Sequence, residues 1–240
     1  MLEANEFEQS AADLCLYRKR IGTKLCYVLV YVDDLIVASE DQHLIDALER
    51  ALEKNSQISS LGNIKFYLGI EVIRDQAGDF LISQRKYIDN VVQSAGLQDA
   101  KESPVPIDPG YFKTEEDDHL LPNNQDYQKI VGKLLYIAVN SRPDIAAAIS
   151  ILSRKVSCPT TRDWNELKRM VRYLKGTAEL KLRLSSSGDS SGLIEYADAD
   201  WAECRSDPIA DTFSSLMEVQ LHGHAENNPV SHCQLQRRSS

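Results

Sequence analysis

The sequence predicts an α+β protein. Three observations carry this: short runs rich in β-branched and aromatic residues near the N-terminus, amphipathic helical patterns between them, and three further helical patterns beyond residue 124. With 42% hydrophobic and 26% charged residues, the 240-residue chain has ordinary globular composition and enough apolar surface for a core. We expect one or two domains.

The first strand signals are "LCYVLVYV" at residues 25–32 and "LIVAS" at 35–39, separated only by Asp33 and Asp34. This pattern predicts a tight β-hairpin over residues 25–38 with the two aspartates at its turn. The next stretch, "DQHLIDALERALEKN", opens with Asp41 as a cap candidate. It predicts an amphipathic helix that covers the sheet, and its apolar face holds Leu44, Ile45, Leu48, Ala51 and Leu52.

A second hairpin is predicted from "KFYLGIEVIRD", the turn "QAG" and "DFLISQ". The helix "RKYIDNVVQSAG" should follow it and end at Gly96. The predicted order to this point is ββαββα.

The second half of the chain begins with an acidic connector. Residues 108–126 hold six acids, one lysine and two prolines, which is typical of a solvated segment. Helical patterns then predict helices over about 125–140, 143–157 and 161–175, packed as a three-helix unit. Their boundary signals are Pro143 at a first helical position, Pro159 after the second helix, Thr161 or Asp163 as a cap, and Gly176 as a stop.

Beyond the helices, "LKLRLSSSGDSSGLIEYADADWAE" predicts strand, turn and strand, and places Asp198 and Asp200 at the end of an apolar segment. For Asp200, a capping or structural role is as good an explanation as a functional one. Asp33 and Asp34 also have a plain structural explanation, because Asp is common in hairpin turns. The functional alternative is a phosphoryl-transfer site, where clustered carboxylates hold divalent ions, and hard oxygen ligands suit magnesium.

The charge is unevenly distributed. A net charge of −9 argues against simple electrostatic binding of nucleic acid, yet residues 161–184 hold seven Lys and Arg against three acids. Lys168, Arg172 and Lys175 fall on one helical face with Arg169 beside them. Such a face can neutralise phosphates of a duplex, and a merely solvated helix face is the alternative.

No apolar run approaches 18 residues and the N-terminus is polar, so neither a membrane span nor a signal peptide is expected. Five scattered cysteines without a C-x-x-C pair argue against a disulfide framework and a zinc site. We expect an intracellular chain with reduced thiols and no membrane partner. A cytoplasmic particle and the nucleus both stay open as its compartment.

An ordered series of motifs carries a family resemblance. The segment "YVLVYVDDLIVASED" resembles the active-site hairpin of reverse transcriptases, and its surroundings over residues 11–205 are similar to the Pol polyprotein of copia-type LTR retrotransposons. The matching stretches are "ADLCLY", "LGNIKFYLGIEV", "ISQRKYIDNVV", "YQKIVGKLLYIAVNSRPDIAAAISILSRKVSCPT", "WNELKRMVRYLKGT" and "YADADWA".

The resemblance implies a fold and an activity. Residues 1–97 would form the C-terminal part of a reverse transcriptase palm, 98–124 an acidic linker, 125–184 a helical thumb or connection, and 185–206 the first strands of an RNase H-like domain. The activity would be that of an RNA-directed DNA polymerase that uses magnesium. Its partners would be an RNA/DNA template–primer duplex and the remainder of a Pol polyprotein.

The resemblance also implies residue roles. Asp33 would ligate the catalytic metals with Asp34 as its partner, and Asp198 would be the first metal-binding carboxylate of RNase H. The remaining roles are contacts to the primer or the duplex, and they fall on Tyr31, Val32, Phe66, Tyr67, Leu68, Gly69, Lys168, Arg169, Arg172 and Lys175.

The chain also departs from the family pattern. Reverse transcriptases use a further palm aspartate and fingers upstream of YVDD, and only 32 residues precede Asp33 here. We therefore expect a catalytically incomplete fragment, lacking most of RNase H as well. A non-catalytic nucleic-acid- or protein-binding remnant is the alternative.

Residues 207–240 are expected to form a disordered tail read out of frame. When synonymous codons are chosen freely, shifting the stretch from residue 216 by one base yields "YGGAITWARRKQPCVSLSTTEAEF", which is the expected family continuation. This interpretation also disfavours a metal site made of His222, His224, His232 and Cys233.

Overall fold

The computed structural model describes residues 2–55, 58–112, 118–185 and 231–237, and these form two compact units. The first unit takes residues 1–67 and 225–240, and the second takes residues 68–224. The boundary between these compact units falls after Tyr67, inside the second predicted hairpin.

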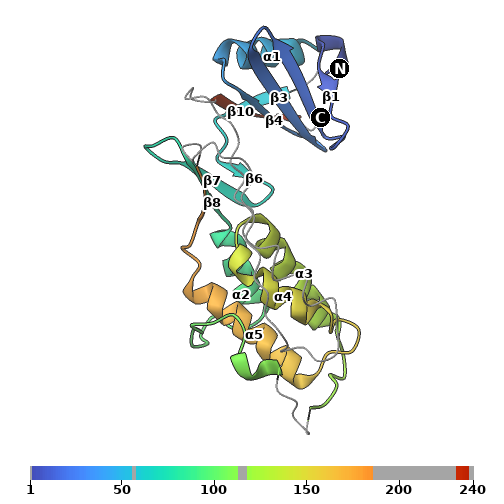
Figure 1. Cartoon of the computed structure of the whole chain (residues 1–240), viewed down its shortest axis with the longest axis vertical. Coiled ribbons are helices and arrows are strands. Elements are labelled where there is room, and N and C mark those ends of the chain that lie inside the picture. Colours follow the sequence, from blue (N-terminus) through green and yellow to red (C-terminus); the bar gives the residue numbers. More distant parts are fainter. Residues whose placement is uncertain (1, 56–57, 113–117, 186–230, 238–240) are drawn as a thin grey trace. The chain divides into compact units, whose positions relative to one another are not determined.

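The first unit is an antiparallel sheet with one helix (Figure 1). Its strand order is β1-β2-β3-β4-β10-β5. The strands are β1 (Glu8–Gln9), β2 (Leu16–Ile21), β3 (Lys24–Tyr31), β4 (Asp34–Ser39), β5 (Ile58–Gly62) and β10 (Ser231–Arg237), preceded by a short 3-10 turn, η1 (Glu3–Asn5). Every ladder that links these strands is antiparallel.

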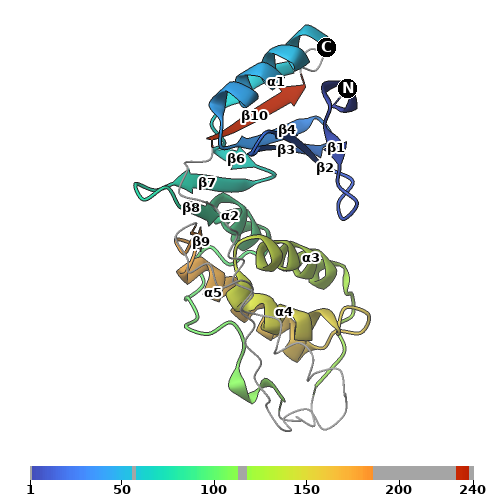
Figure 2. The ribbon, with the colours of Figure 1, turned by 45° about the horizontal axis from the view of Figure 1, so that its top comes forward.

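Helix α1 (Gln42–Asn55) lies across one face of this sheet (Figure 2). Asp41 caps it as predicted, because its carboxylate accepts a hydrogen bond of 3.0 Å from the His43 amide. Three of the predicted helix residues, Ile45, Leu48 and Leu52, are buried in the core of the unit. They pack with strand residues that alternate along β3 and β4, namely Cys26, Val28, Leu35 and Val37.

Four strands of this sheet, β1, β2, β5 and β10, were not predicted. Strand β2 carries the polar run "YRKR", which lacks the period-two alternation of a strand, yet it pairs with β3 along its whole length. Strand β10 corrects the expectation of a disordered tail over residues 231–237, because it pairs with both β4 and β5. The rest of that predicted tail lies outside the described residues, as do Asp198, Asp200 and nearly all of the predicted RNase H-like start.

The second unit combines a small sheet with a helical bundle (Figure 1). Strand β6 (Phe66–Tyr67) closes the first unit, and the second contains β7 (Ile70–Arg74), β8 (Phe80–Ser83) and β9 (Leu182–Leu184), with β8 between the other two. The helices are α2 (Arg85–Ser94), α3 (Gln125–Asn140), α4 (Ala146–Ser153) and α5 (Thr161–Gly176), with 3-10 turns η2 (Pro109–Phe112) and η3 (Pro143–Ile145).

The three predicted helices exist, with two corrections. The second is a 3-10 turn followed by a shorter α4, because residues 154–156 continue with hydrogen bonds to the third preceding carbonyl. The cap of α5 is Thr160, whose hydroxyl accepts from the Asp163 amide at 3.2 Å while the Asp163 carboxylate accepts from the Thr160 amide at 2.8 Å. Asp163 thus belongs to a capping box, and Thr161 is the first residue of the helix.

A partly buried ion pair connects the end of α3 to the end of α5. The Arg142 guanidinium, in a side chain that is 3% exposed, binds both carboxylate oxygens of Asp144 at 2.9 and 2.7 Å. It also donates to the Thr177 carbonyl at 2.9 Å and lies over the Tyr173 ring, 5.5 Å from the centroid. This cluster fixes the C-terminal end of α5 beside the turn that joins α3 to η3.

In the parts of the chain that the structure describes, no helix is both long enough and apolar enough to cross a lipid bilayer.

Candidate active site

The β3–β4 hairpin places Asp33 and Asp34 together at one end of the first sheet. Tyr31 pairs with Asp34 across the ladder, so Val32 and Asp33 form a two-residue turn. This confirms the hairpin predicted over residues 25–38. Asp33 is exposed and Asp34, the first residue of β4, is half-buried.

The turn holds Val32 in a strained conformation. Val32 has φ of +54° and is 84% exposed. A positive φ in a β-branched residue is a genuine outlier, and such residues typically cost about 1–3 kcal/mol and gather at functional sites. The hairpin tip thus presents an apolar side chain to solvent directly beside two carboxylates.

Two tyrosines lie next to this tip. The Tyr31 and Tyr67 rings meet edge to face with centroids 6.5 Å apart. Burial raises the pKa of Tyr67, and the neighbouring charge of Asp34 raises it further. The fold therefore brings Tyr31, Asp34 and Tyr67 together, although 33 positions of sequence separate the last two.

The carboxylates of Asp33 and Asp34 are of the ligand type that magnesium prefers. Magnesium in polymerase-type sites takes one or two protein carboxylates, with waters and substrate phosphates completing its coordination. Asp33 and Asp34 supply two such groups, the first of them exposed to solvent. Within the described ranges, however, no group of three or more His, Cys, Asp or Glu side chains is placed to hold a metal ion.

The predicted primer-contact residues Phe66 to Gly69 form β6 and the turn that follows it. Leu68 and Gly69 have φ values of +50° and +80°. Phe66 and Leu68 are 46% and 37% exposed. The "FYLGIEV" segment is thus two strands joined by a tight turn, because two consecutive residues with positive φ reverse the chain.

Sequence reasoning did not identify Tyr136 of α3, whose hydroxyl donates to the Leu68 carbonyl. These residues are 68 positions apart, and no local pattern could have joined them.

The basic residues of α5 have unequal environments. The Lys175 ammonium donates to the Gln98 and Ala100 carbonyls at 2.5 and 2.8 Å. Arg169 forms ion pairs with Asp108 and Glu166 at 2.9 and 3.1 Å. Lys168 lies over the Trp164 ring, 5.8 Å from its centroid. Lys168, Arg169 and Arg172 line a groove of about 330 Å³ together with Leu97, Ala100, Asn165 and Glu166.

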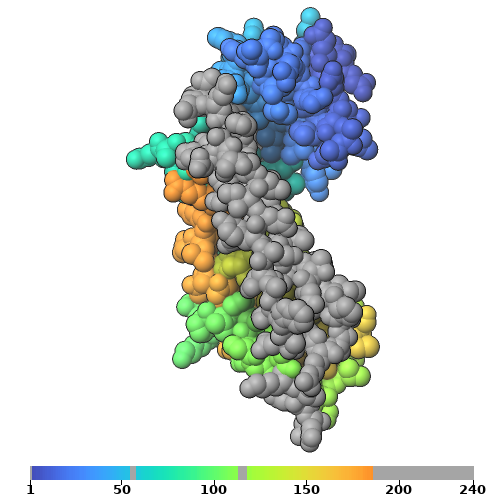
Figure 3. All heavy atoms as spheres, viewed as in Figure 1, coloured from blue at the N-terminus to red at the C-terminus, as the bar shows by residue number. Residues whose placement is uncertain are grey.

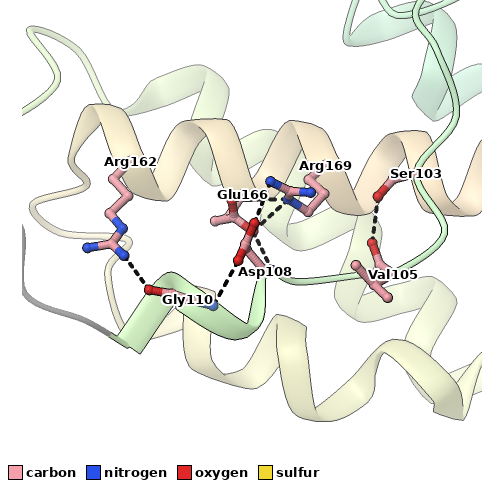
Figure 4. A network of polar contacts seen from close by, with 7 residues as sticks. All are labelled: Ser103, Val105, Asp108, Gly110, Arg162, Glu166 and Arg169. Carbon is pink, nitrogen blue, oxygen red and sulfur yellow. Dashed lines mark hydrogen bonds and ion pairs between the residues drawn. The ribbon is translucent and has the colours of Figure 1, made fainter.

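The segment predicted as a solvated linker packs along α5 instead (Figure 4). We call residues 98–112 the strap. Glu166, 7% exposed, accepts a hydrogen bond of 2.8 Å from the Asp108 amide, and Arg162 donates to the Gly110 carbonyl at 2.6 Å. In the space-filling view the green atoms of the strap lie directly against the orange atoms of α5 (Figure 3).

Asp163 extends this network. Its carboxylate, in a residue 4% exposed, accepts a 2.5 Å hydrogen bond from the Tyr111 hydroxyl. Burial, followed by this hydrogen bond to a carboxylate, raises the pKa of Tyr111. The acidic strap is therefore part of the folded second unit, because the cations and buried carboxylates of α5 bind it.

Comparison with known proteins agrees with the resemblance of the β3–β4 hairpin to reverse transcriptases. A family model described as "Reverse transcriptase (RNA-dependent DNA polymerase)" matches residues 1–109. The chain is 34% identical over 196 residues to the "Retrovirus-related Pol polyprotein from transposon RE2" of Arabidopsis thaliana, covering 82% of this chain and 13% of that protein. It is 30% identical over 212 residues to the Pol polyprotein from transposon TNT 1-94 of Nicotiana tabacum, covering 84% and 16%.

A shorter relative matches over most of both chains. The "Uncharacterized mitochondrial protein AtMg00810" of Arabidopsis thaliana is 32% identical over 180 residues, which cover 75% of this chain and 73% of the relative. No solved structure matches. The chain spans 13% of the length of the RE2 polyprotein. On these grounds the chain belongs to the reverse transcriptase family, within the retrovirus-related Pol polyproteins of copia-type transposons.

Proposed function

We propose that this chain is the catalytic-hairpin part of an RNA-directed DNA polymerase, and that Asp33 and Asp34 bind magnesium at the primer terminus. The observation that carries the proposal is the two-residue turn that sets both carboxylates at one open sheet end beside a strained Val32. When bound, the ion would stabilise negative charge on the transferring phosphoryl group.

The neighbouring side chains would position the substrate. Asp33, which is exposed, is the direct metal ligand in this proposal, and Asp34 supports it. Tyr31 and Val32 are the most exposed apolar groups of the hairpin and would pack against the terminal nucleotide. Phe66, Tyr67, Leu68 and Gly69 would contact the primer strand, and the basic residues of α5 would contact phosphates of a template–primer duplex.

We further propose that the 240-residue chain by itself does not extend a primer. The described residues offer two adjacent carboxylates and no third group that could complete a two-ion site. Because phosphoryl transfer depends on positioning and metal electrostatics, an incomplete site should bind the ion weakly. The chain would still bind a duplex, as expected for a non-catalytic nucleic-acid-binding remnant. Asp198 as an RNase H carboxylate stays a prediction, since it lies outside the described residues.

Metal binding can be tested without activity. We expect Mn²⁺, a paramagnetic probe for Mg²⁺, to broaden backbone resonances of residues 31–36 selectively in the wild-type chain. Asp33→Asn should abolish this broadening and Asp34→Asn should weaken it. Asp99→Asn, which removes an exposed carboxylate of the second unit, serves as the control. Broadening that survives in the Asp33→Asn/Asp34→Asn protein would remove these residues from the metal site.

Primer extension tests the second claim. We expect no Mg²⁺-dependent product from the purified chain with an RNA template and DNA primer. Extension that occurs in the wild type and vanishes in Asp33→Asn would show a complete polymerase and refute the inactive-chain claim.

A further inference from the structure

The turn at Leu68–Gly69 has a sequence that does not suit its backbone. Two consecutive positive φ values, +50° and +80°, favour Asn-Gly or Gly-Gly. Gly69 satisfies this preference, but Leu68 has a Cβ atom that crowds the backbone in the left-handed region. The turn therefore requires support from outside its own residues.

Tyr136 supplies that support from the helical bundle. Its hydroxyl donates to the Leu68 carbonyl, which lies in the turn. The Tyr136 ring is itself held edge to face by Tyr87 of α2, with centroids 5.2 Å apart. One turn earlier on α3, Lys133 donates to the Ser94 hydroxyl of α2 at 2.8 Å, and Leu134 and Ile137 are fully buried. The donor thus stands on two helices that are fixed against each other.

We propose that Tyr136 is a positioning residue, and that its hydroxyl holds the strained Leu68–Gly69 turn in the conformation that meets the primer strand. Leu68 remains 37% exposed in this arrangement, so holding its backbone also fixes an apolar side chain at the surface. The inference deepens the proposed function and rests on the assignment of this hairpin to the primer.

The test pairs a hydroxyl deletion with relief of the strain. Tyr136→Phe keeps the ring against Tyr87 and removes the hydroxyl that donates to Leu68. Leu68→Asn replaces a residue that resists positive φ by one that tolerates it and forms the favoured Asn-Gly turn. Tyr87→Phe is the matched control, because it removes a hydroxyl from the neighbouring ring. Amide hydrogen exchange at residues 69–71 and affinity for an RNA/DNA template–primer hairpin are measured for each protein.

We expect exchange at the turn to accelerate about fivefold in Tyr136→Phe, the size of one typical net hydrogen bond, and affinity to fall by a similar factor. Tyr87→Phe should change neither. In the Leu68→Asn background, the further change Tyr136→Phe should have a clearly smaller effect on both, because the turn no longer depends on the tether.

Three results would overturn the inference. The first is unchanged exchange in Tyr136→Phe, and the second is an equal effect of that change in the wild-type and Leu68→Asn backgrounds. The third is faster exchange with unchanged affinity, while Phe66→Ala weakens the duplex complex; the hairpin would then contact nucleic acid without needing the tether. If Phe66→Ala and Leu68→Ala both leave affinity unchanged, the proposed primer contact itself fails, whereas the exchange data test the tether independently of that contact.

Discussion

Arg142 carries a charge in the interior of the second unit, and Asp144 compensates it. Burial alone would raise the pKa of Asp144, but hydrogen bonds and charge from Arg142, followed by the Tyr173 hydroxyl, outweigh burial and hold the pKa below its ordinary value of 3.8. A carboxyl whose pKa is lowered by folding stabilises the fold above its unfolded pKa. That stability is lost as the pH falls through the lower, folded value.

At this residue scale we predict that Asp144→Asn destabilises the second unit by about 1–3 kcal/mol near neutral pH, a figure reduced because the Asp144 side chain is 35% exposed. The deficit relative to wild type should shrink as the pH falls below about 4, where Asp144 of the unfolded wild-type chain becomes protonated, and it should vanish once the pH lies below the lower, folded pKa. Urea unfolding at several pH values measures it, with the exposed Asp99→Asn as control. A deficit that stays constant down to about pH 2 would contradict the linkage.

Helix α5 shows how one element divides its charges between folding and binding. Arg169 and Lys175 bind the strap, and Lys168 and Arg172 line the groove, which Arg169 also borders. The four residues were expected to act together as one phosphate-binding face. Their surroundings instead favour Lys168 and Arg172 as the pair that meets a duplex.

We predict at the element scale that Lys168→Ala/Arg172→Ala lowers the slope of log affinity against log salt by about 2 for duplex binding, since each contact releases about one counterion. Lys175→Ala should leave that slope nearly unchanged and lower the thermal stability, because two carbonyls lose their donor. Fluorescence anisotropy across a salt series measures the slopes. The exposed Lys155→Ala controls for loss of charge. An equal loss of slope in Lys155→Ala would contradict the assignment to the groove.

Local patterns predicted local elements well. The β3–β4 hairpin followed from two β-rich runs around an aspartate pair, and α3 followed from its helical period, because both signals lie within one segment. The ion pair between Arg169 and Asp108 could not be predicted, since these residues are 61 positions apart and pairing at that distance depends on the finished fold. Strand β2 escaped prediction because its polar run shows no alternation. The candidate site was predicted at the hairpin, whereas the support of its neighbouring turn by Tyr136 required the structure.

At the scale of the whole molecule, the residues that the structure describes form two separate buried clusters. One gathers the sheet and α1, with Leu52 fully buried, and the other gathers α2 to α5, with Leu134 fully buried. Each cluster belongs to one compact unit. We infer that the chain does not unfold as a single two-state system.

Calorimetry should therefore resolve two thermal transitions. Leu52→Ala and Leu134→Ala each delete the same side chain at a fully buried site, and each should cost about 2–5 kcal/mol. We expect each change to lower one transition and leave the other within experimental error. A single transition that both variants shift equally would show that the two clusters unfold together.

The strap also determines where the polypeptide can be divided for study. Its composition invites a cut just after the strap, between residues 112 and 124. Such a cut would deprive Asp163 and Glu166, which are 4% and 7% exposed, of the hydrogen bonds that the Tyr111 hydroxyl and the Asp108 amide donate to them. Buried carboxylates deprived of donors are costly, so the helical piece isolated in this way should misfold or aggregate. A stable fragment should therefore contain both the strap and α5.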